Sequence, residues 1–295
     1  MVGCTLLETK KSDPAAIVGD LPTRWTAESG TIPGAAVTGW LDDFGSRELR
    51  SLVEEAIGGN YNLVAVRARV VQAQERAHIA GADRLPRASL GEQTSRSQNL
   101  RGAAFQTVRA NNFNLTLDVA WEVDLWGRVK DLRDAELDRV TTQMSLFEAS
   151  RLSLAGNVVK TAFTILEGRE QVTLSRRTLA SLNTNLKILD SRMEAGAATE
   201  RAALEISLSR ADIARSESSV LVFQRQVDES KRLLETLLGR YPAGEIEALP
   251  GLPRVTRAIP AGLPSELLLR RPDLLAAEAQ VDAAMKDLSA SRKAL

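Results

Sequence analysis

The stretch from Phe113 to Leu125 alternates between apolar and polar side chains, which is the period of a β-strand with one apolar face. Every even position in it except Ala120 is polar or acidic. Every odd position is apolar: Phe113, Leu115, Leu117, Val119, Trp121, Val123 and Leu125. The alternation lasts longer than the roughly 9–11 residues that a tilted strand needs to cross a bilayer, so it predicts a membrane strand. Residues 85–98 form a second, more polar candidate strand, and we expect the two to pair.

A membrane strand pair constrains the fold because lipid offers no hydrogen-bond partner to an open strand edge. Such strands close into a barrel, and closure needs about eight strands or more. One strand pair per repeat therefore predicts a barrel that several subunits share. The alternative is a half-buried strand in a soluble sheet, which does not explain the length of the run or the two tryptophans near its end, Trp121 and Trp126.

The rest of the chain is dominated by helical patterns. From Leu137 to Met193 apolar residues recur in alternating steps of three and four, a period that indicates a supercoiled helix. A helix from Arg128 to Glu194 would be about 100 Å long. Gly196 in "MEAGAATER" offers a helix stop, and a second apolar stripe follows, so an antiparallel helical hairpin is expected. The predicted fold class is mainly α with a β-strand pair: a long coiled-coil helical hairpin, forming part of an α-barrel, plus membrane β-barrel strands shared between subunits.

Composition excludes several classes of function. Lys+Arg and Asp+Glu are balanced at 38 each, so no net field favours nucleic acid. Cys4 is the only cysteine and His78 the only histidine, which excludes an internal disulfide and a multi-Cys or multi-His metal site. His78 lies in a helical pattern and is expected to be an exposed histidine without a ligand or catalytic role, so a Ser/His/Asp triad is not expected. No run approaches the roughly 20 apolar residues of a spanning helix. We therefore expect neither an enzyme nor a cofactor.

An internal repeat is visible in the sequence. "NLVAVRARVVQAQ" from Asn62 is similar to "DLLAAEAQVDAAM" from Asp273, which indicates that a second copy of the first unit begins there. The first copy reaches its strand at Pro86, and the corresponding point would lie just beyond Leu295. The sequence is thus expected to end before a second strand pair, and with one pair per chain a trimer is not expected to close a conducting barrel.

These patterns divide the chain into six segments. No proline lies between Pro86 and Pro242, which suits uninterrupted helices and strands. The segments are an extended arm (1–39), a first helical segment (40–84), the strand pair (85–126), the helical hairpin (127–239), a Pro/Gly-rich connector (240–264) and the first helix of an incomplete second repeat (265–295).

Three motifs resemble one known family, the TolC-like outer-membrane factors of the OprM/NodT lipoprotein branch. They are "DLWGR" (Asp124–Arg128), "WLDDFGSRELRSLVEEAIGGNYNL" (Trp40–Leu63) and "GLPSELLLRRPDLLAAEAQ" (Gly262–Gln280). The resemblance runs from about Trp40 to the C-terminus. It implies a homotrimeric channel with a shared outer-membrane β-barrel, helices that continue across the periplasm, and the connector in an equatorial region. It also implies docking to a periplasmic adaptor and an inner-membrane transporter for efflux of small molecules.

The strand alternation and the resemblance together assign candidate site residues. Alternation places Phe113, Leu115, Leu117 and Val119 toward lipid, and Asn114, Thr116 and Asp118 toward the lumen or the trimer interior. The resemblance makes Asp124, Trp126, Gly127 and Arg128 the strand–helix junction. It makes Ala195, Gly196, Ala197, Ala198 and Thr199 the periplasmic tip that meets the adaptor. Members commonly continue the tip with Leu-Asp, whereas this chain has Arg201-Ala202, so a gate residue carried by that Asp is not expected here.

The N-terminus "MVGC" resembles the end of a lipobox, in which Cys4 would carry the lipid. The basic and apolar regions of a signal peptide are not seen in this sequence, and a chance Gly-Cys is the alternative. The expected location is the outer membrane, lipid-anchored and extending into the periplasm.

The alternative function is that of a periplasmic coiled-coil adaptor or a structural hairpin protein. An adaptor also carries a helical hairpin, but small β domains flank that hairpin. In this sequence a membrane-type strand and a repeat flank it, which favours the channel.

Overall fold

The computed structural model of the protein describes residues 39–101, 106–196, 199–255 and 270–294. Cys4 and nearly all of the expected arm, and Ala197 and Ala198 of the expected tip, lie outside the described residues. The chain divides into two compact units. Among the described residues, one unit comprises 68–146 and 271–294, and the other comprises 39–67, 147–255 and 270.

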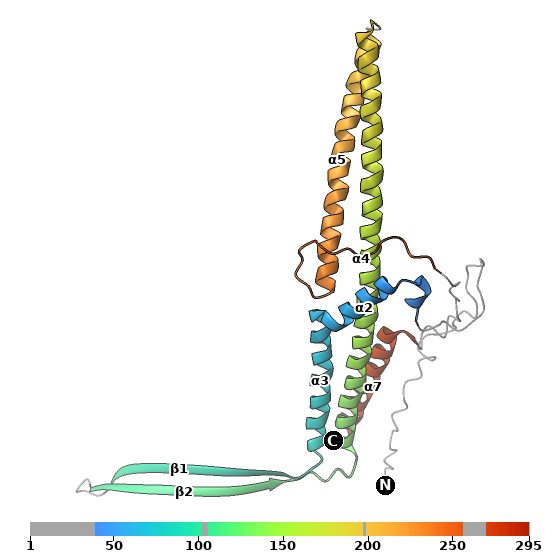
Figure 1. Ribbon diagram of the computed structural model, residues 1–295. Coiled ribbons are helices and arrows are strands. Elements are labelled where there is room, and N and C mark those ends of the chain that lie inside the picture. Colours follow the sequence, from blue (N-terminus) through green and yellow to red (C-terminus); the bar gives the residue numbers. More distant parts are fainter. Residues whose placement is uncertain (1–38, 102–105, 197–198, 256–269, 295) are drawn as a thin grey trace, which may run out of the picture. The chain divides into compact units, whose positions relative to one another are not determined.

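Helices dominate the described residues, and one two-stranded antiparallel sheet accompanies them there (Figure 1). The elements in chain order are η1 (Asp42–Phe44), α2 (Arg47–Gly59), α3 (Tyr61–Ala82), β1 (Arg87–Arg101), β2 (Gln106–Ala120), α4 (Arg128–Glu194), α5 (Glu200–Leu237) and α7 (Pro272–Lys293). The predicted fold class, mainly helical with a strand pair, is confirmed. α4 alone has 67 residues and is therefore about 100 Å long.

Asn60 separates α2 from α3 and ties both to the end of α5. Its Oδ1 accepts a hydrogen bond from a backbone N–H in the first turn of α3 (3.0 Å), and its Nδ2 donates to the Leu237 carbonyl (2.9 Å). The adjoining glycines are required by close backbone approach. A Cβ on Gly59 would lie 2.6 Å from the Leu238 carbonyl oxygen, and a Cβ on Gly239, whose φ is +79°, would lie 2.1 Å from the Gly59 oxygen.

The unit that contains residues 39–67 and 147–255 has its core where α2, the middle of α4, the end of α5 and the following connector meet. Its largest fully buried side chains are Leu49, Val158, Ile165 and Leu234. Burying a side chain of this size stabilises the fold by about 1.5–3 kcal/mol. Val158 and Ile165 belong to the long apolar stripe seen in the sequence. In this stretch, therefore, α4 packs against the neighbouring helices with the face that carries the stripe.

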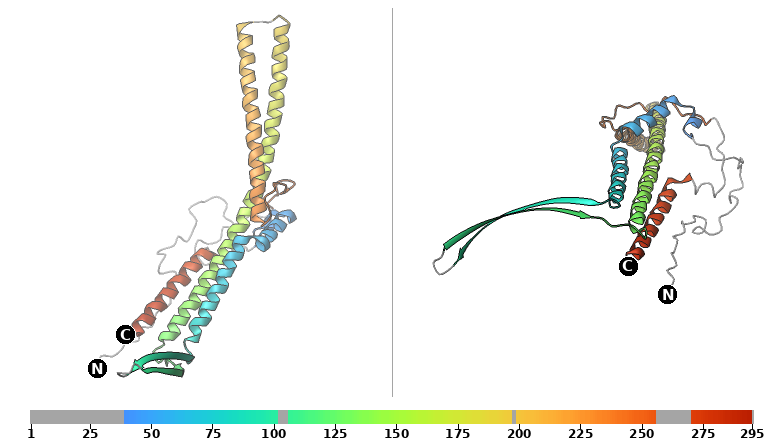
Figure 2. Two further views of the ribbon diagram at one scale, coloured as in Figure 1. Left: turned by 90° about the vertical axis from the view of Figure 1, so that its left-hand side faces the viewer. Right: turned by 90° about the horizontal axis from the view of Figure 1, so that it is seen from below.

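Beyond this core α4 and α5 run side by side as an antiparallel hairpin (Figure 2). Val172, Ile206 and Val227 are buried along the two helices. Gly168 allows the close approach, because a Cβ there would lie 2.6 Å from Val227 Cγ2. The expected helical hairpin is therefore present, and a glycine lies at a point where the two helices approach closely.

In the other unit α7 lies against the first part of α4 (Figure 2). Ion pairs set the register of the two helices. Lys293 Nζ lies 2.5 Å from Asp131 Oδ2, and Lys286 Nζ lies 2.6 Å from Asp138 Oδ2. Small buried residues of α7 permit the approach: Ala276, Ala279, Ala283 and Ala290. The two lysines are two helical turns apart on α7, and the two aspartates are two turns apart on α4. Because the later lysine pairs with the earlier aspartate, the ion pairs favour the antiparallel arrangement of the two helices.

α3 and α7 lie at corresponding positions of the two similar sequence segments. Both contain 22 residues. The offset that takes Asn62 to Asp273 also takes the first residue of α3 to the first of α7, and the last to the last. The repeat that the sequence indicates is thus matched by equal helix bounds.

The strand hairpin pairs β1 with β2 from Arg87↔Ala120 to Arg101↔Gln106. The expectation that the second strand continues to Leu125 is wrong, since β2 ends at Ala120. In this register the next partner of β2 would be Pro86, which has no N–H to donate to the ladder. The first strand begins directly after that proline and extends past residue 98, the expected end. No helix in the part of the chain that the structure describes is long and apolar enough to cross a membrane.

Candidate functional site

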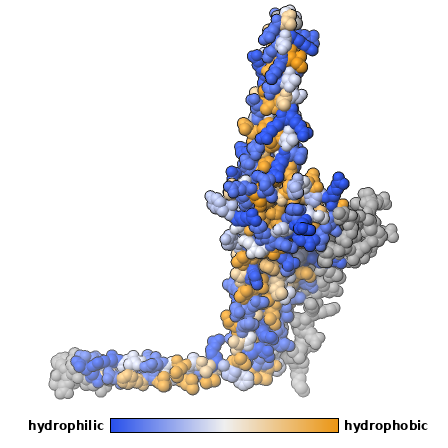
Figure 3. Space-filling view, viewed as in Figure 1, coloured by the Kyte–Doolittle hydropathy of each residue, from blue (hydrophilic) through white to orange (hydrophobic). Residues whose placement is uncertain are grey.

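The strand hairpin has one apolar face, and residues directly opposite each other in the register share a face. On this face, four odd-numbered residues of β2 lie opposite even-numbered residues of β1: Val119 opposite Ala88, Leu117 opposite Leu90, Leu115 opposite Glu92 and Phe113 opposite Thr94. The four apolar side chains of β2 are 66–75% exposed. Figure 3 shows apolar atoms gathered along one side of the hairpin, in the half nearer the helices. Among the described residues, the apolar strip that these four side chains of β2 form is therefore left uncovered.

The opposite face of the hairpin is polar and almost uncharged near its middle. Asn114 lies opposite Gln93, and Thr116 lies opposite Gly91. Thr116 Oγ1 donates a hydrogen bond to the Gly91 carbonyl oxygen (3.3 Å), and a Cβ on Gly91 would lie 3.0 Å from that hydroxyl oxygen. Amide and hydroxyl groups of this kind are suited to water rather than to lipid.

One carboxylate interrupts the apolar face. Glu92 lies opposite Leu115, and Thr94 Oγ1 donates a hydrogen bond to Glu92 Oε1 (3.4 Å). In lipid an acidic group costs less than the about 2–4 kcal/mol of a central Arg or Lys, so a single carboxylate is tolerable. The sequence does not reveal this residue, because the face on which a β1 side chain lies depends on the register with β2.

The junction between β2 and α4 is organised by Asp124, which caps the helix. Its Oδ1 accepts from the Val129 N–H (3.1 Å) and its Oδ2 from the Lys130 N–H (2.7 Å), so two of the free donors at the helix start are satisfied. Desolvation raises the pKa of Asp124, but the N–H groups of Lys130 and Val129 outweigh it and hold the pKa below its ordinary value. The carboxylate is thus charged where the helix dipole favours negative charge.

Gly127 and Arg128 complete the turn. Gly127 has φ +74°, a left-handed conformation that favours glycine. Arg128 forms a bidentate pair with Glu122, with Nε donating to Oε1 (2.9 Å) and Nη2 to Oε2 (2.5 Å). The hydrogen bonds with Glu122 raise the pKa of Arg128 and lower that of Glu122. "DLWGR" is therefore a turn-and-cap motif whose polar residues fix how α4 leaves the strand.

Two tryptophans lie at the helix end of the apolar strip. Trp121 is 57% exposed, and its Nε1 donates to the Arg84 carbonyl oxygen (3.1 Å), which links the two chain segments that enter and leave the hairpin. Trp126 is 72% exposed. Exposed tryptophans with a polar edge are typical of the boundary between lipid and water.

The reversal between α4 and α5 is formed by Gly196 and Thr199. Gly196 has φ +92° and donates its N–H to the Met193 carbonyl oxygen (3.2 Å), which closes α4. Thr199 Oγ1 accepts from the Ala202 N–H (3.1 Å) and caps α5. Ala195 donates its N–H to the Ser191 carbonyl (3.1 Å). Nothing lies within 4 Å of a Cβ built on Gly196, so a side chain at this position would meet open space.

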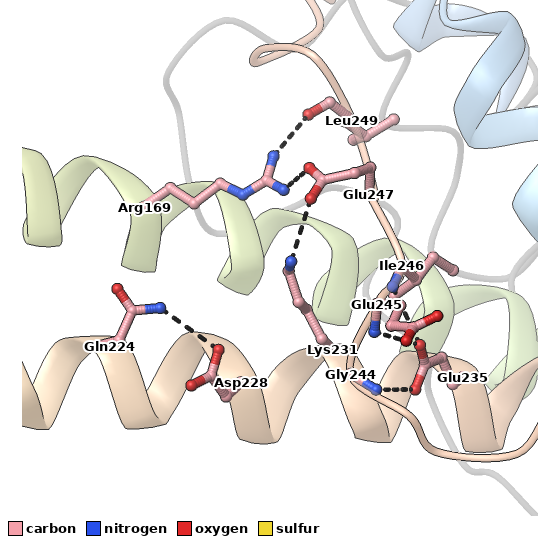
Figure 4. A network of polar contacts seen from close by, with 10 residues as sticks. All are labelled: Arg169, Gln224, Asp228, Lys231, Glu235, Gly244, Glu245, Ile246, Glu247 and Leu249. Atoms are coloured by element: carbon pink, nitrogen blue, oxygen red, sulfur yellow. Dashed lines mark hydrogen bonds and ion pairs between the residues drawn. The ribbon is translucent and has the colours of Figure 1, made fainter.

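A buried carboxylate that sequence reasoning missed holds the connector after α5 (Figure 4). Glu235 is 4% exposed and accepts hydrogen bonds from the N–H groups of Gly244 (2.6 Å), Glu245 (2.8 Å) and Ile246 (3.0 Å). Burial raises the pKa of Glu235, but these three donors outweigh it and hold the pKa below its ordinary value. No signal distinguishes Glu235 from the solvated charges of the same helix, because its partners lie in a segment without a regular pattern.

Side chains of α4 and α5 extend the same network. Arg169 pairs with Glu247, and its Nη1 donates to the Leu249 carbonyl oxygen (3.5 Å). Lys231 Nζ lies 3.2 Å from Glu247 Oε1. The first residues of the connector are therefore anchored to both helices of the hairpin.

Residues 52–240 match the model of a family described as outer membrane efflux protein. The chain belongs to this family. The resemblance indicated by the three sequence motifs is thereby confirmed.

Individual members of the efflux-protein family align over most of this chain. OpmQ of Pseudomonas putida, a pyoverdine export outer membrane protein, is 32% identical over 271 residues, which cover 87% of this chain and 56% of OpmQ. SilC of Salmonella typhimurium, a probable outer membrane lipoprotein, is 25% identical over 303 residues, or 100% of this chain and 63% of SilC. The solved structure of the outer-membrane channel OprN aligns over 92% of this chain and 63% of its own, with a TM-score of 0.74 and 24% identity, and so bears on the fold alone. The chain thus spans 56–63% of the length of these proteins.

Proposed function

We propose that this chain is the outer-membrane channel component of a tripartite efflux system, which passes small molecules from an inner-membrane pump across the periplasm and the outer membrane. The observation that carries the proposal is an uncovered apolar strip on a strand hairpin, joined through a capped turn to a helix about 100 Å long. The strip suits lipid, and the helix reaches far from it. Membership of the efflux-protein family favours a channel over a periplasmic adaptor or a structural hairpin protein.

The proposed assembly, for a chain that also carries the second strand pair expected from the repeat, is a homotrimer that shares one barrel. A single hairpin has two open edges, which lipid does not tolerate, so strands from other parts of the assembly must complete the sheet. The helices also present uncovered apolar residues for lateral packing. Val64 and Val71 lie two turns apart on α3 and are 55% and 51% exposed. The periplasmic adaptor and the inner-membrane transporter are the proposed partners, with outer-membrane lipid around the barrel and no role for nucleic acid, catalysis or a cofactor.

Opposite substitutions on the two faces of the hairpin test the function. Leu117→Arg puts a charge on the proposed lipid face and costs about 2–4 kcal/mol per copy near mid-bilayer, whereas Thr116→Arg puts the same charge on the polar face. We expect Leu117→Arg to abolish outer-membrane assembly and dye efflux in cells that lack their own channel, and Thr116→Arg to keep both. Equal loss, or equal retention, for the two neighbours would argue against a barrel strand.

The turn around Gly196 is proposed as the periplasmic tip that meets the adaptor. Gly196 has open space beside its Cα, and small residues such as Ala195 permit close approach of another chain. Ala195→Trp is expected to reduce crosslinking to the adaptor and efflux while leaving the channel assembled. Ala180→Trp, the same change at an exposed position of α4 about four helical turns from Ala195, serves as the comparison. Intact adaptor crosslinking in Ala195→Trp would show that the turn is only a helix reversal.

Cys4 is proposed as the site of lipidation, and the name of the relative SilC, a probable outer membrane lipoprotein, supports this. Cys4→Ser should abolish incorporation of a clickable fatty-acid analogue into the protein. Continued incorporation in that variant would place the acyl chain elsewhere.

A further inference from the structure

The apolar face of the hairpin changes character beyond Phe113, toward the end of the hairpin away from the helices. The next two rows on the same face are Arg96 opposite Asn111 and Arg109 opposite Gln98. Both arginines are exposed. By strand alternation they point to the same side as Phe113, so a basic band borders the apolar strip.

The charge in these rows is confined to one face. Between residues 93–98 of β1 and 109–114 of β2, the two arginines are the only charged residues. The opposite face of these rows carries Gln93, Ser95, Ser97, Ala110, Asn112 and Asn114. A strand end that merely needed solubility would have no reason to place its charges on the apolar side alone.

Arg96 and Arg109 occupy neighbouring positions on the two strands, and neither has an acidic partner among the described residues. Arg96 and Arg109 occupy diagonal positions, whose Cβ atoms are about 7–8 Å apart or less. Neither lies within 4.0 Å of a carboxylate oxygen among the residues that the structure describes. Arg109 Nε donates to Gln98 Oε1 (3.3 Å), its neighbour across the strands. Glu92 is on the same face, but four residues from Arg96 along the strand, a separation of about 13 Å.

The band lies at the depth of lipid headgroups if the strip faces lipid. Arg96 and Arg109 are two and four residues beyond the Phe113 row, about 7 and 13 Å along the strand. A strand tilt of about 35–45° reduces this to roughly 5 and 10 Å above the last apolar row. Guanidinium groups bind phosphate oxygens in a bidentate manner, and two of them at this spacing can hold one phosphate or two adjacent ones.

We propose that Arg96 and Arg109 form a docking surface for the phosphate groups of an anionic lipid in the outer leaflet. The inference rests on the proposed function, because it requires that the apolar strip faces lipid. The surface would anchor the barrel at a fixed depth, with the tryptophans at the other end of the strip as the second anchor.

Native mass spectrometry of the assembled protein in detergent, titrated with lipid A, tests the proposal. Each arginine near a charged lipid surface contributes about fivefold in affinity, so Arg96→Gln with Arg109→Gln is expected to weaken lipid A binding by about 25-fold. The matched control is Arg96→Ser with Ser97→Arg, which keeps the net charge and moves one arginine to the polar face. The affinity of this control variant for lipid A should fall by about fivefold. Dephosphorylated lipid A should bind the wild-type protein as weakly as intact lipid A binds the double variant.

Three outcomes would overturn the inference. They are equal lipid A binding by wild type and the double variant, undiminished binding of dephosphorylated lipid A, and displacement of lipid A by inorganic phosphate, which would show a site for a free anion. Labelling of Leu117→Cys by a membrane-soluble maleimide separates this from the proposed function. If that cysteine labels from lipid, a negative result removes only the arginine surface; if it does not, the proposed function fails and the inference with it.

Discussion

Removal of the Glu235 carboxylate is expected to free the connector from the helical hairpin. Glu235→Ala leaves the N–H groups of Gly244, Glu245 and Ile246 without their acceptor. An unsatisfied buried donor costs about 1–3 kcal/mol, and only the Ile246 bond is fully buried, so water relieves part of the loss at the other two. The sum is about 3–4 kcal/mol. Glu235→Gln keeps one acceptor oxygen but loses the charge, and should cost about 2 kcal/mol.

Hydrogen exchange of the three amides measures this directly. Since about 1.4 kcal/mol is a factor of ten, exchange at residues 244–246 should accelerate by more than about a hundredfold in Glu235→Ala and by about thirtyfold in Glu235→Gln. Glu245→Gln is the matched control, because it makes the same chemical change on an exposed neighbouring side chain and should alter exchange by less than about threefold. Unchanged exchange in Glu235→Ala would refute the anchoring role.

The same carboxylate predicts how the connector responds to acid. Because the folded pKa of Glu235 is lowered, its stabilising contribution is fully present above the unfolded value of about 4.3 and is lost as the pH falls through the lower folded value. Exchange at residues 244–246 should therefore be slower in the wild-type protein than in the Glu235→Gln variant only above that range, and the two proteins should converge in stronger acid. Curves that stay parallel down to the lowest pH would contradict this.

Two further predictions concern the cap and the glycine crossing. Asp124→Ala should destabilise the start of α4 by about 1–2 kcal/mol, and Asp124→Asn should destabilise it by less because Asn is also a good cap. Hydrogen exchange of the Val129 and Lys130 amides measures the destabilisation in both variants. Equal acceleration of exchange in the two variants would show that the capping bonds are unimportant. Gly239→Ala should lower the free energy of unfolding by at least about 2 kcal/mol, because Gly239 has a positive φ and the new Cβ would meet the Gly59 carbonyl. Gly58→Ala should be neutral or slightly stabilising, because nothing lies within 4 Å of a Cβ built there. Thermal or chemical unfolding measures both. The reverse order would mean that the crossing of α2 and the α5 end is not tight.

The sequence predicts those parts of this fold that have a period. The alternation from Phe113 through Val119 and the long apolar stripe through Val158 and Ile165 depend only on nearby positions in the sequence, so the existence of the strand and of the helix can be predicted from it. Gly168 breaks the stripe in the sequence, yet it is a contact point with Val227, because the close approach of two helices needs the absence of a side chain. The need for a glycine at position 168 therefore depends on a residue far along the chain, which the local pattern does not show.

The register and the buried polar groups depend on similar long-range information. The end of β2 at Ala120 follows from its pairing with Arg87 and the proline before it, not from the apolar residues that continue to Leu125. Glu92 and Arg96 acquire a face only when β1 is paired with β2. Glu235 and its three N–H donors likewise come together only in the folded unit.

Cysteine labelling along residues 113–119 in outer membranes tests most directly whether this hairpin is a barrel strand. A membrane-soluble maleimide should label the odd-numbered positions Phe113, Leu115, Leu117 and Val119, and a charged, water-soluble maleimide should label the even-numbered positions Asn114, Thr116 and Asp118. The unsubstituted protein serves as the background control. A strict alternation between the two reagents is the result we predict, and equal access of the water-soluble reagent to all seven positions would contradict the channel.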